Sequence, residues 1–236
     1  MIKNFTIYGE RNSGTNWIQS IMSGKSYYHD NNKVEDNYSG IFFKEGTPAF
    51  NIPLIWNYGY KHFFGYHTKQ IKNRGDHTLF IGIVRNPYDW IMALSIAKHQ
   101  VPKENHDIKN FLTNEWYSVS TNPNDRNYGL ERMDDRDFDT GLRYQNIFAL
   151  RSKKLRYLYE TMPAIAKNYE LIKYEELCKN PLSILESWSD KYDLDLNKNF
   201  LQPIKKDPYK IEPEIKKIID ENIDWDIEHR VGYDYR

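Results

Sequence analysis

The chain has 236 residues, enough for one domain with a sizeable core, or for one domain carrying an insertion. Basic and acidic residues both number 33, so no overall charge draws the protein to nucleic acid or to an anionic membrane. The single Cys178 excludes an internal disulfide and a zinc site with two cysteines, and it fits a reducing compartment. The chain has no signal-peptide pattern and no apolar run of roughly 18 residues. We therefore expect a soluble protein of the cytoplasm or another intracellular space, without a nucleic-acid or membrane partner.

The N-terminal segment predicts a strand, a loop and a helix in succession. Ile2 to Tyr8 alternates apolar and polar residues, Gly9 to Gly14 is a polar loop bounded by glycines, and apolar residues from Trp17 to Met22 recur at helical spacing. Residues 24–57 have an irregular composition, and 58–64 predict a second strand.

The middle of the chain predicts a buried strand followed by a capped helix. Residues 79–84 form a continuous apolar run, as in a strand that is buried on both faces. Asn86 is a good N-cap, and Pro87 suits the first helical position. The helix should run to about His99 and end before Pro102.

A strongly polar stretch, residues 102–141, predicts a surface insertion or lid. Within it, the acidic run from Asp134 to Asp137 is expected to be a solvated face and not a metal site. A long amphipathic helix over 142–162 should follow, with Asn146 to Arg151 contributing core packing and surface charge.

The C-terminal third predicts a strand over 170–174 and helices over 181–192 and 214–223. Strands that alternate with helices indicate an α/β fold, in which helices flank a central parallel sheet. We expect one domain over residues 1–236.

The loop from Gly9 to Gly14 has the glycine spacing of a phosphate-binding P-loop and the required strand and helix on either side. Backbone N–H groups in such a loop form an anion site. Thr15 and Asn16 stand where an NTPase has lysine and a magnesium-binding hydroxyl, and Arg11 supplies a cation from inside the loop. This argues against an ordinary NTPase or kinase and for a nucleotide reaction without a metal. A plain strand-to-helix turn is the alternative.

Three motifs resemble those of the sulfotransferases that use 3′-phosphoadenosine-5′-phosphosulfate (PAPS). Arg11-Asn-Ser-Gly-Thr-Asn-Trp17 is similar to the family's 5′-phosphosulfate loop, PKSGTTW. Val84-Arg-Asn-Pro-Tyr-Asp89 is similar to its 3′-phosphate motif, RNPxD, and Ile172-Lys-Tyr-Glu-Glu-Leu177 with Pro181 is similar to its KYEDL…P segment. The motifs occur in the family's order along nearly the whole chain. The resemblance implies a three-layer fold like that of P-loop NTPases.

The resemblance also implies roles for individual residues. Arg11, Asn12, Ser13, Gly14, Thr15 and Asn16 would hold the 5′-phosphosulfate, Trp17 would pack on the adenine, Arg85 would bind the 3′-phosphate, and Tyr174 would touch the adenine edge. PAPS would be the sulfuryl donor, and 3′-phosphoadenosine-5′-phosphate (PAP) the product. The chain departs from the pattern at Asn12, where the family has lysine, and at Ala93, where it has a 3′-phosphate-binding serine. Ser95 lies about 200° further around the helix and does not substitute simply. The family's C-terminal Arg-Lys-Gly element has no clear copy here.

Sulfuryl transfer needs a group that accepts the proton of the acceptor and a cation that neutralises the leaving phosphate. The family places a lysine and a histidine on a strand end, and Lys61-His62 precedes the Arg85 strand. We predict His62 as the base, with Lys61 or Arg11 as the charge stabiliser. His67 and Glu10 are the alternative bases.

The function predicted from the sequence is transfer of a sulfuryl group to a hydroxyl or amine of a small molecule or glycan. Abundant tyrosine and tryptophan, including Trp56 and Trp116, favour a carbohydrate but also suit a phenol or a peptide. Two alternatives stay open: a phosphotransferase of the P-loop kinase type and a catalytically inactive nucleotide-binding module. The sequence does not indicate an oligomeric state.

Overall fold

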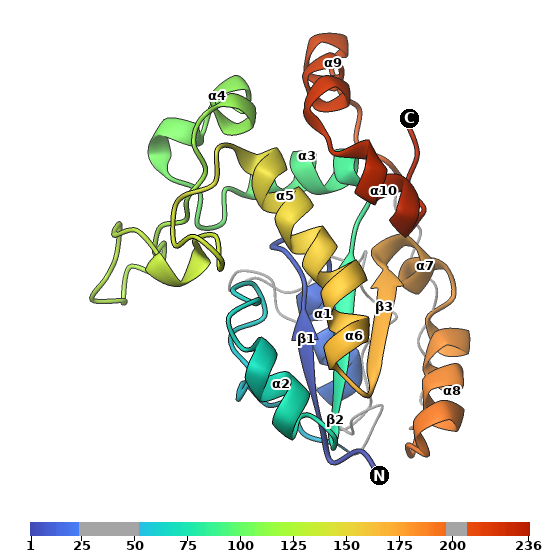
Figure 1. Cartoon of the computed structure of the whole chain (residues 1–236). Coiled ribbons are helices and arrows are strands. Elements are labelled where there is room, and N and C mark those ends of the chain that lie inside the picture. The colour runs from blue at the N-terminus through green and yellow to red at the C-terminus, as the bar shows by residue number, and fades with distance from the viewer. Residues whose placement is uncertain (24–51, 197–206) are drawn as a thin grey trace.

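The computed structural model describes residues 1–23, 52–196 and 207–236, which form an α/β fold around a parallel sheet (Figure 1). The sheet has the order β1 (Asn4–Tyr8), β2 (Thr78–Val84), β3 (Tyr169–Lys173). All pairs are parallel, with Tyr8 opposite Gly82 and Val84 opposite Lys173. The carboxyl ends of the strands therefore meet at one edge, where ligands bind in open α/β sheets.

The apolar residues of β2 alternate between two cores, which explains the continuous apolar run. On one face, Leu79, Ile81 and Ile83 pack with α1 (Thr15–Ser23), α7 (Tyr174–Lys179) and α8 (Pro181–Tyr192). On the other face, Phe80 and Val84 pack with α2 (Thr68–Arg74), α5 (Ile147–Arg156), α6 (Met162–Ile165) and α10 (Trp225–Val231). In Figure 1, α5 crosses in front of the sheet and α1 lies behind it. The predicted α/β class, with a parallel sheet flanked by helices, is confirmed.

A third apolar cluster lies beyond the carboxyl edge of the sheet (Figure 1). It joins α3 (Pro87–Ala97), α4 (Ile108–Thr113), α9 (Pro213–Asn222) and the first turns of α5. Phe111, Leu112 and Trp116 contribute buried side chains to it. The 102–141 segment, which also holds η3 (Lys103–Asn105) and η4 (Met133–Asp135), is therefore partly core.

The strand predicted over residues 58–64 is wrong. These residues form turns, because Gly59 and Gly65 adopt φ values of +97° and +114° that bend the chain. Nearby, Leu54 makes an isolated parallel bridge to Phe5. Of the stretch 24–57, which was predicted to be irregular, residues 24–51 lie outside the described residues.

The predicted N-cap of α3 is confirmed, and a second cap shortens the long helix that was predicted from residue 142. The side chain of Asn86 accepts hydrogen bonds from the amides of Tyr88 and Asp89 at the start of α3. The long helix begins at Ile147 and not at 142, because the side chain of Asn146 caps the amide of Ala149. It continues through the π-helical turn η5 (Tyr157–Thr161) into α6. No helix within the described ranges is long and apolar enough to cross a membrane.

Candidate functional site

The loop between β1 and α1, the predicted phosphate loop, is shaped by two glycines in close contact with β2 and with Tyr174 at the start of α7. A Cβ atom at Gly9 would lie 2.6 Å from the carbonyl oxygen of Ile83. Gly14 has φ +100°, and a Cβ there would lie 2.4 Å from the ring of Tyr174. The glycine spacing in the sequence therefore reflects contacts with β2 and with the Tyr174 segment.

The predicted phosphate loop is held by hydrogen bonds with α3 and with Arg85, the residue that follows β2. Trp90 Nε1 donates to the carbonyl of Arg11 at 2.8 Å, and Asn12 Nδ2 donates to the carbonyl of Ala93 at 2.8 Å. Arg85 Nη1 donates to the carbonyl of Asn12 at 3.0 Å. Asn12 itself has φ +60°, a conformation that asparagine tolerates better than most residues. Asn12, at the position where the family that the sequence resembles has lysine, thus has a structural part in the turn.

The mouth of the loop is the first turn of α1. Both the amide and the hydroxyl of Ser13 donate to the carbonyl of Glu10, at 3.1 and 2.6 Å. These two predicted phosphate ligands of Ser13 are therefore engaged inside the loop. The first amides of a helix have no acceptor within the helix, so those of Thr15, Asn16 and Trp17 form a potential anion site. The Asn16 side chain is exposed, whereas Thr15 and Trp17 are buried.

The three motifs singled out in the sequence meet at the carboxyl edge of the sheet. The guanidinium of Arg85, at the end of β2, lies 4.9 Å from the ring centroid of Tyr174 and 5.8 Å from that of Tyr209. Trp17 packs edge-on against Tyr174, with ring centroids 5.9 Å apart. Within the described residues, the buried Nε of Arg85 has no hydrogen-bond partner. Tyr209 was not predicted as part of this group.

His62 lies against the phosphate loop with one ring nitrogen engaged. Its Nδ1 is 2.7 Å from the carbonyl oxygen of Gly9, which only accepts, so Nδ1 carries the proton. Nε2 then holds the lone pair that a base needs. Burial, followed by the charge of Arg11, lowers the pKa of His62 well below its usual value, so the ring is neutral at pH 7. The ring is almost fully buried, and Tyr60 packs edge-on against it at 5.3 Å.

Lys61 connects this segment to the first turn of α1. Its ammonium donates to Asn16 Oδ1 and, at 3.2 Å, to Gln19 Oε1. Burial lowers the pKa of Lys61 to about 8. Lys61 therefore places a cation beside the exposed end of the predicted anion site.

Arg11, which was predicted both as a phosphate ligand and as a charge stabiliser, points away from the mouth of the loop. Its guanidinium is fully buried and donates to Gln100 Oε1 at 2.8 Å, to Ser118 Oγ at 2.8 Å and to Asp135 Oδ2 at 2.6 Å. It also forms an ion pair with Glu10 at 3.3 Å. This geometry does not support either predicted role, because the charge of Arg11 is already compensated by buried carboxylates.

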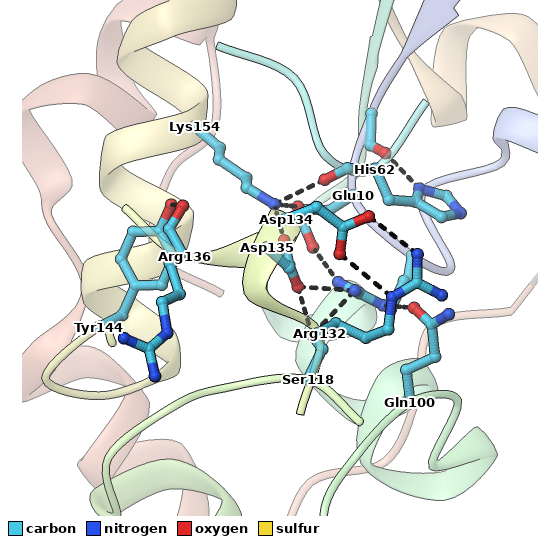
Figure 2. Close-up of polar contacts among 12 residues, drawn as sticks. Glu10, His62, Gln100, Ser118, Arg132, Asp134, Asp135, Arg136, Tyr144 and Lys154 are labelled. Carbon is cyan, nitrogen blue, oxygen red and sulfur yellow. Dashed lines mark hydrogen bonds and ion pairs between the residues drawn. The ribbon is translucent and has the colours of Figure 1, made fainter. Parts of the chain in front are cut away.

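The expectation that residues 134–137 form a solvated face is wrong for Asp135, which is 1% exposed (Figure 2). Its carboxylate accepts hydrogen bonds from Arg11, from Ser118 and from Lys154, the last at 2.6 Å. Burial by itself raises the pKa of Asp135, but the charges of Arg11 and Lys154 outweigh it and lower the pKa below its usual value. The neighbouring Asp134 is about half exposed and pairs with Arg132.

Sequence reasoning missed two cations on the buried face of α5. Lys154 donates to Glu10, to Asp135 and to the carbonyl of His62. Arg151 pairs with Glu228 and donates to the carbonyl of Arg85 at 2.9 Å. Arg151 follows Ile147 by four residues, and Lys154 follows Arg151 by three, in register with the apolar stripe of the helix. That register is the signal that could have identified them, and it corrects the expectation of surface charge at Arg151.

The alternative candidates for the base are less favourably placed. Glu10 is buried and bound to Lys154 and Arg11. His67 precedes α2 and lies beside Gly59. Ser95, which was considered only as a replacement for the phosphate-binding serine missing at Ala93, donates to the carbonyl of Met92 within α3. Over the described ranges, no group of three or more histidine, cysteine or acidic side chains is arranged to hold a metal ion.

A small cavity of about 20 Å³ lies beneath the loop, lined by the ends of β2 and the buried face of α5. Four charged residues from three segments face it: Glu10, Arg85, Arg151 and Lys154. Its volume suits a water molecule and is too small for a phosphate group.

Comparison with known proteins identifies a similar fold. A crystal structure described as a sulfotransferase from Alicyclobacillus acidocaldarius matches with a TM-score of 0.56 and 12% identity, covering 99% of this chain and 97% of that chain. No family model and no curated protein matches the sequence. At this level of identity the likeness concerns the fold, which this chain shares with that sulfotransferase over almost its whole length.

Proposed function

We propose that this protein is a sulfotransferase that takes the sulfuryl group from PAPS and releases PAP. The observation that carries the proposal is the meeting of the three motifs, in which Arg85 donates to the Asn12 carbonyl and stacks on Tyr174. These residues are far apart in the sequence and meet at the carboxyl ends of parallel strands, where such folds bind ligands. The fold likeness to a sulfotransferase supports the same activity.

In this proposal the donor is bound by residues at the edge of the sheet. The buried Nε of Arg85 has no partner among the described residues, which suits a group that takes a 3′-phosphate. Gly14, Thr15 and Asn16 would hold the 5′-phosphosulfate through the helix N-terminus, and Trp17 and Tyr174 would contact the adenine. Arg11, Asn12 and Ser13 would support the loop from within rather than bind the donor.

When bound, PAPS supplies an activated sulfuryl group, and negative charge builds up on the 5′-phosphate as the group leaves. Lys61, at the exposed end of the loop, would neutralise that charge, in place of the alternative Arg11. His62 would accept the acceptor's proton at Nε2, because the Gly9 carbonyl keeps the proton of the neutral ring on Nδ1. No residue of the described set is required to hold a metal for this chemistry.

The proposed acceptor is a hydroxyl or amine of a small molecule or glycan, and a carbohydrate is favoured. Trp56 and Tyr60 are 40% and 41% exposed, lie with ring centroids 5.6 Å apart, and adjoin His62 through Tyr60. Such a pair suits the apolar face of a sugar ring. Trp116 is fully buried between α4 and α5 and is excluded from this role, contrary to expectation.

Thermal shift with PAP, compared with ATP–Mg²⁺, tests the donor. A ligand at about 100 times its Kd should stabilise the fold by roughly 2.7 kcal/mol. PAP should shift the Tm and ATP–Mg²⁺ should not. The reverse pattern would establish the P-loop kinase alternative and overturn the proposal.

The involvement of Arg11 in buried ion pairs favours one second candidate, an inactive nucleotide-binding module. A screen for transfer of radiolabelled sulfate from PAPS to glycans, phenols and amines distinguishes the two. Turnover that disappears in His62→Ala supports the enzyme. PAP binding without turnover on any acceptor supports the module.

A further inference from the structure

Lys154 occupies an unusual position for a lysine, on the buried face of the last turn of α5, where its side chain points toward Glu10 and Asp135 (Figure 2). Its side chain is 3% exposed. The ammonium donates to Glu10 Oε1 at 2.5 Å, to Asp135 Oδ1 at 2.6 Å and to the carbonyl oxygen of His62 at 2.6 Å. One side chain thus binds the phosphate loop, the 102–141 segment and the His62 segment.

The surrounding charges are balanced. Two carboxylates, Glu10 and Asp135, face two cations, Arg11 and Lys154, and all four side chains are nearly or fully buried. Buried ions are tolerated when they are paired and hydrogen-bonded, as they are here. Charge balance alone does not explain the bond to the His62 carbonyl, which is neutral.

The phosphate loop keeps its shape through contacts that do not involve Lys154. Trp90 and Arg85 bind the loop backbone directly, and the Asn12 side chain of the loop donates to the carbonyl of Ala93 in α3. The Lys61–His62 segment, in contrast, forms turns. The Lys61 ammonium binds Asn16 and Gln19 of α1, and the rest of the segment is attached to the loop at few points. Gly9 N donates to the Lys61 carbonyl at 3.0 Å, the His62 ring donates back to the Gly9 carbonyl, and Lys154 binds the carbonyl of His62.

We propose that Lys154 is a positioning residue that keeps the Lys61–His62 segment in register with the phosphate loop, and that Asp135 orients its ammonium. The consequence for turnover rests on the proposed sulfotransferase activity. The positioning itself concerns only contacts within this chain. Losing Lys154 should release Lys61 and His62 while leaving the loop able to bind an anion.

The test compares Lys154→Met with the double variant Lys154→Met/Asp135→Asn. The single variant leaves two buried carboxylates facing one cation. The double variant restores the balance, because only Glu10 and Arg11 remain charged. Lys153→Met is the matched control, because Lys153 is the adjacent residue of α5 and pairs with Asp139 at the surface.

The first readout is the reaction of Lys61 with acetic anhydride as a function of pH, followed by peptide mass spectrometry. The wild-type midpoint should lie at about 8, the pKa of the buried Lys61. Both Lys154 variants should move the midpoint up, toward the value of a solvated lysine, and the Lys153 variant should not. An unchanged midpoint in the double variant overturns the proposal.

The second readout separates binding from turnover. In the double variant, PAP affinity should stay within threefold of wild type, while kcat for sulfuryl transfer should fall at least tenfold. If the double variant has the thermal stability and the kcat of the wild type, Lys154 serves only to neutralise Asp135, and the proposal is overturned. If the wild type neither binds PAP nor transfers sulfate, the proposed function fails, and the Lys61 profile still decides the positioning role.

Discussion

Replacing Asp135 with asparagine should destabilise the protein strongly, although sequence composition suggests a surface acid. The side chain is fully buried and accepts hydrogen bonds from Arg11, Ser118 and Lys154. The variant leaves two buried cations facing one carboxylate, that of Glu10. Breaking a buried ion pair by removing one partner costs about 3–5 kcal/mol. For a chain of this size, that loss corresponds to a fall in Tm of roughly 6–20 °C.

The neighbouring residue provides the control. Asp134 has a side chain that is 52% exposed and pairs with Arg132. Exposed ion pairs contribute about 0–1 kcal/mol to stability, so the free energy of unfolding of Asp134→Asn should differ from that of the wild type by no more than this amount. Urea denaturation at pH 7 measures both variants. If the free energy of unfolding of Asp135→Asn lies within about 1 kcal/mol of the wild-type value, the reasoning on buried charge is refuted.

The pH dependence has a defined sign. The pKa of Asp135 in the folded state lies below its usual 3.8, because the charges of Arg11 and Lys154 outweigh the effect of burial. The stabilisation is therefore present above pH 3.8 and is lost as the pH falls through the folded-state pKa. The difference in free energy of unfolding between Asp135→Asn and the wild type should persist from pH 7 down to about pH 4 and should decrease only below that pH.

Three further predictions concern the loop and its neighbours. Because the pKa of His62 is lowered in the folded state, the unfolded chain takes up the imidazole proton at a higher pH than the folded chain. Acidification from pH 7.5 to 5.5 should therefore lower the free energy of unfolding by about 1.4 kcal/mol, measured by urea denaturation. His62→Asn should remove this part of the pH dependence. If the free energy of unfolding depends on pH in the variant as it does in the wild type, the lowered pKa of His62 is contradicted. Arg85→Lys should raise the Kd for PAP at least tenfold by calorimetry, because lysine lacks the planar fork of nitrogens with which arginine binds the Asn12 carbonyl through one nitrogen and a phosphate through the others. Gly14→Ala should lower the Tm and weaken PAP binding, since its Cβ would meet Tyr174 at a positive φ; equal Tm values would show that the loop adapts.

Local patterns predicted the frame of the molecule well. The apolar run over 79–84 became the central strand, Asn86-Pro87 began α3, and the glycines at 9 and 14 bounded the loop. These features depend only on residues that are close in the sequence: the order of apolar side chains predicts the strand, and a side chain that caps nearby amides predicts the start of the helix. The turns at 58–64 were missed because two glycines with positive φ outweighed the aromatic residues that favour a strand.

The sequence by itself determined the α/β class, the glycine-bounded loop between β1 and α1, and the absence of a Walker lysine from its usual place. Only the tertiary structure decided where the charges lie. Arg11 turns inward to Asp135, and Lys154 reaches the His62 carbonyl from 92 positions away. The physical reason is that burial makes a charge costly unless a partner is present, and that partner comes from whichever segment the fold brings close. No spacing along the chain records such a pairing.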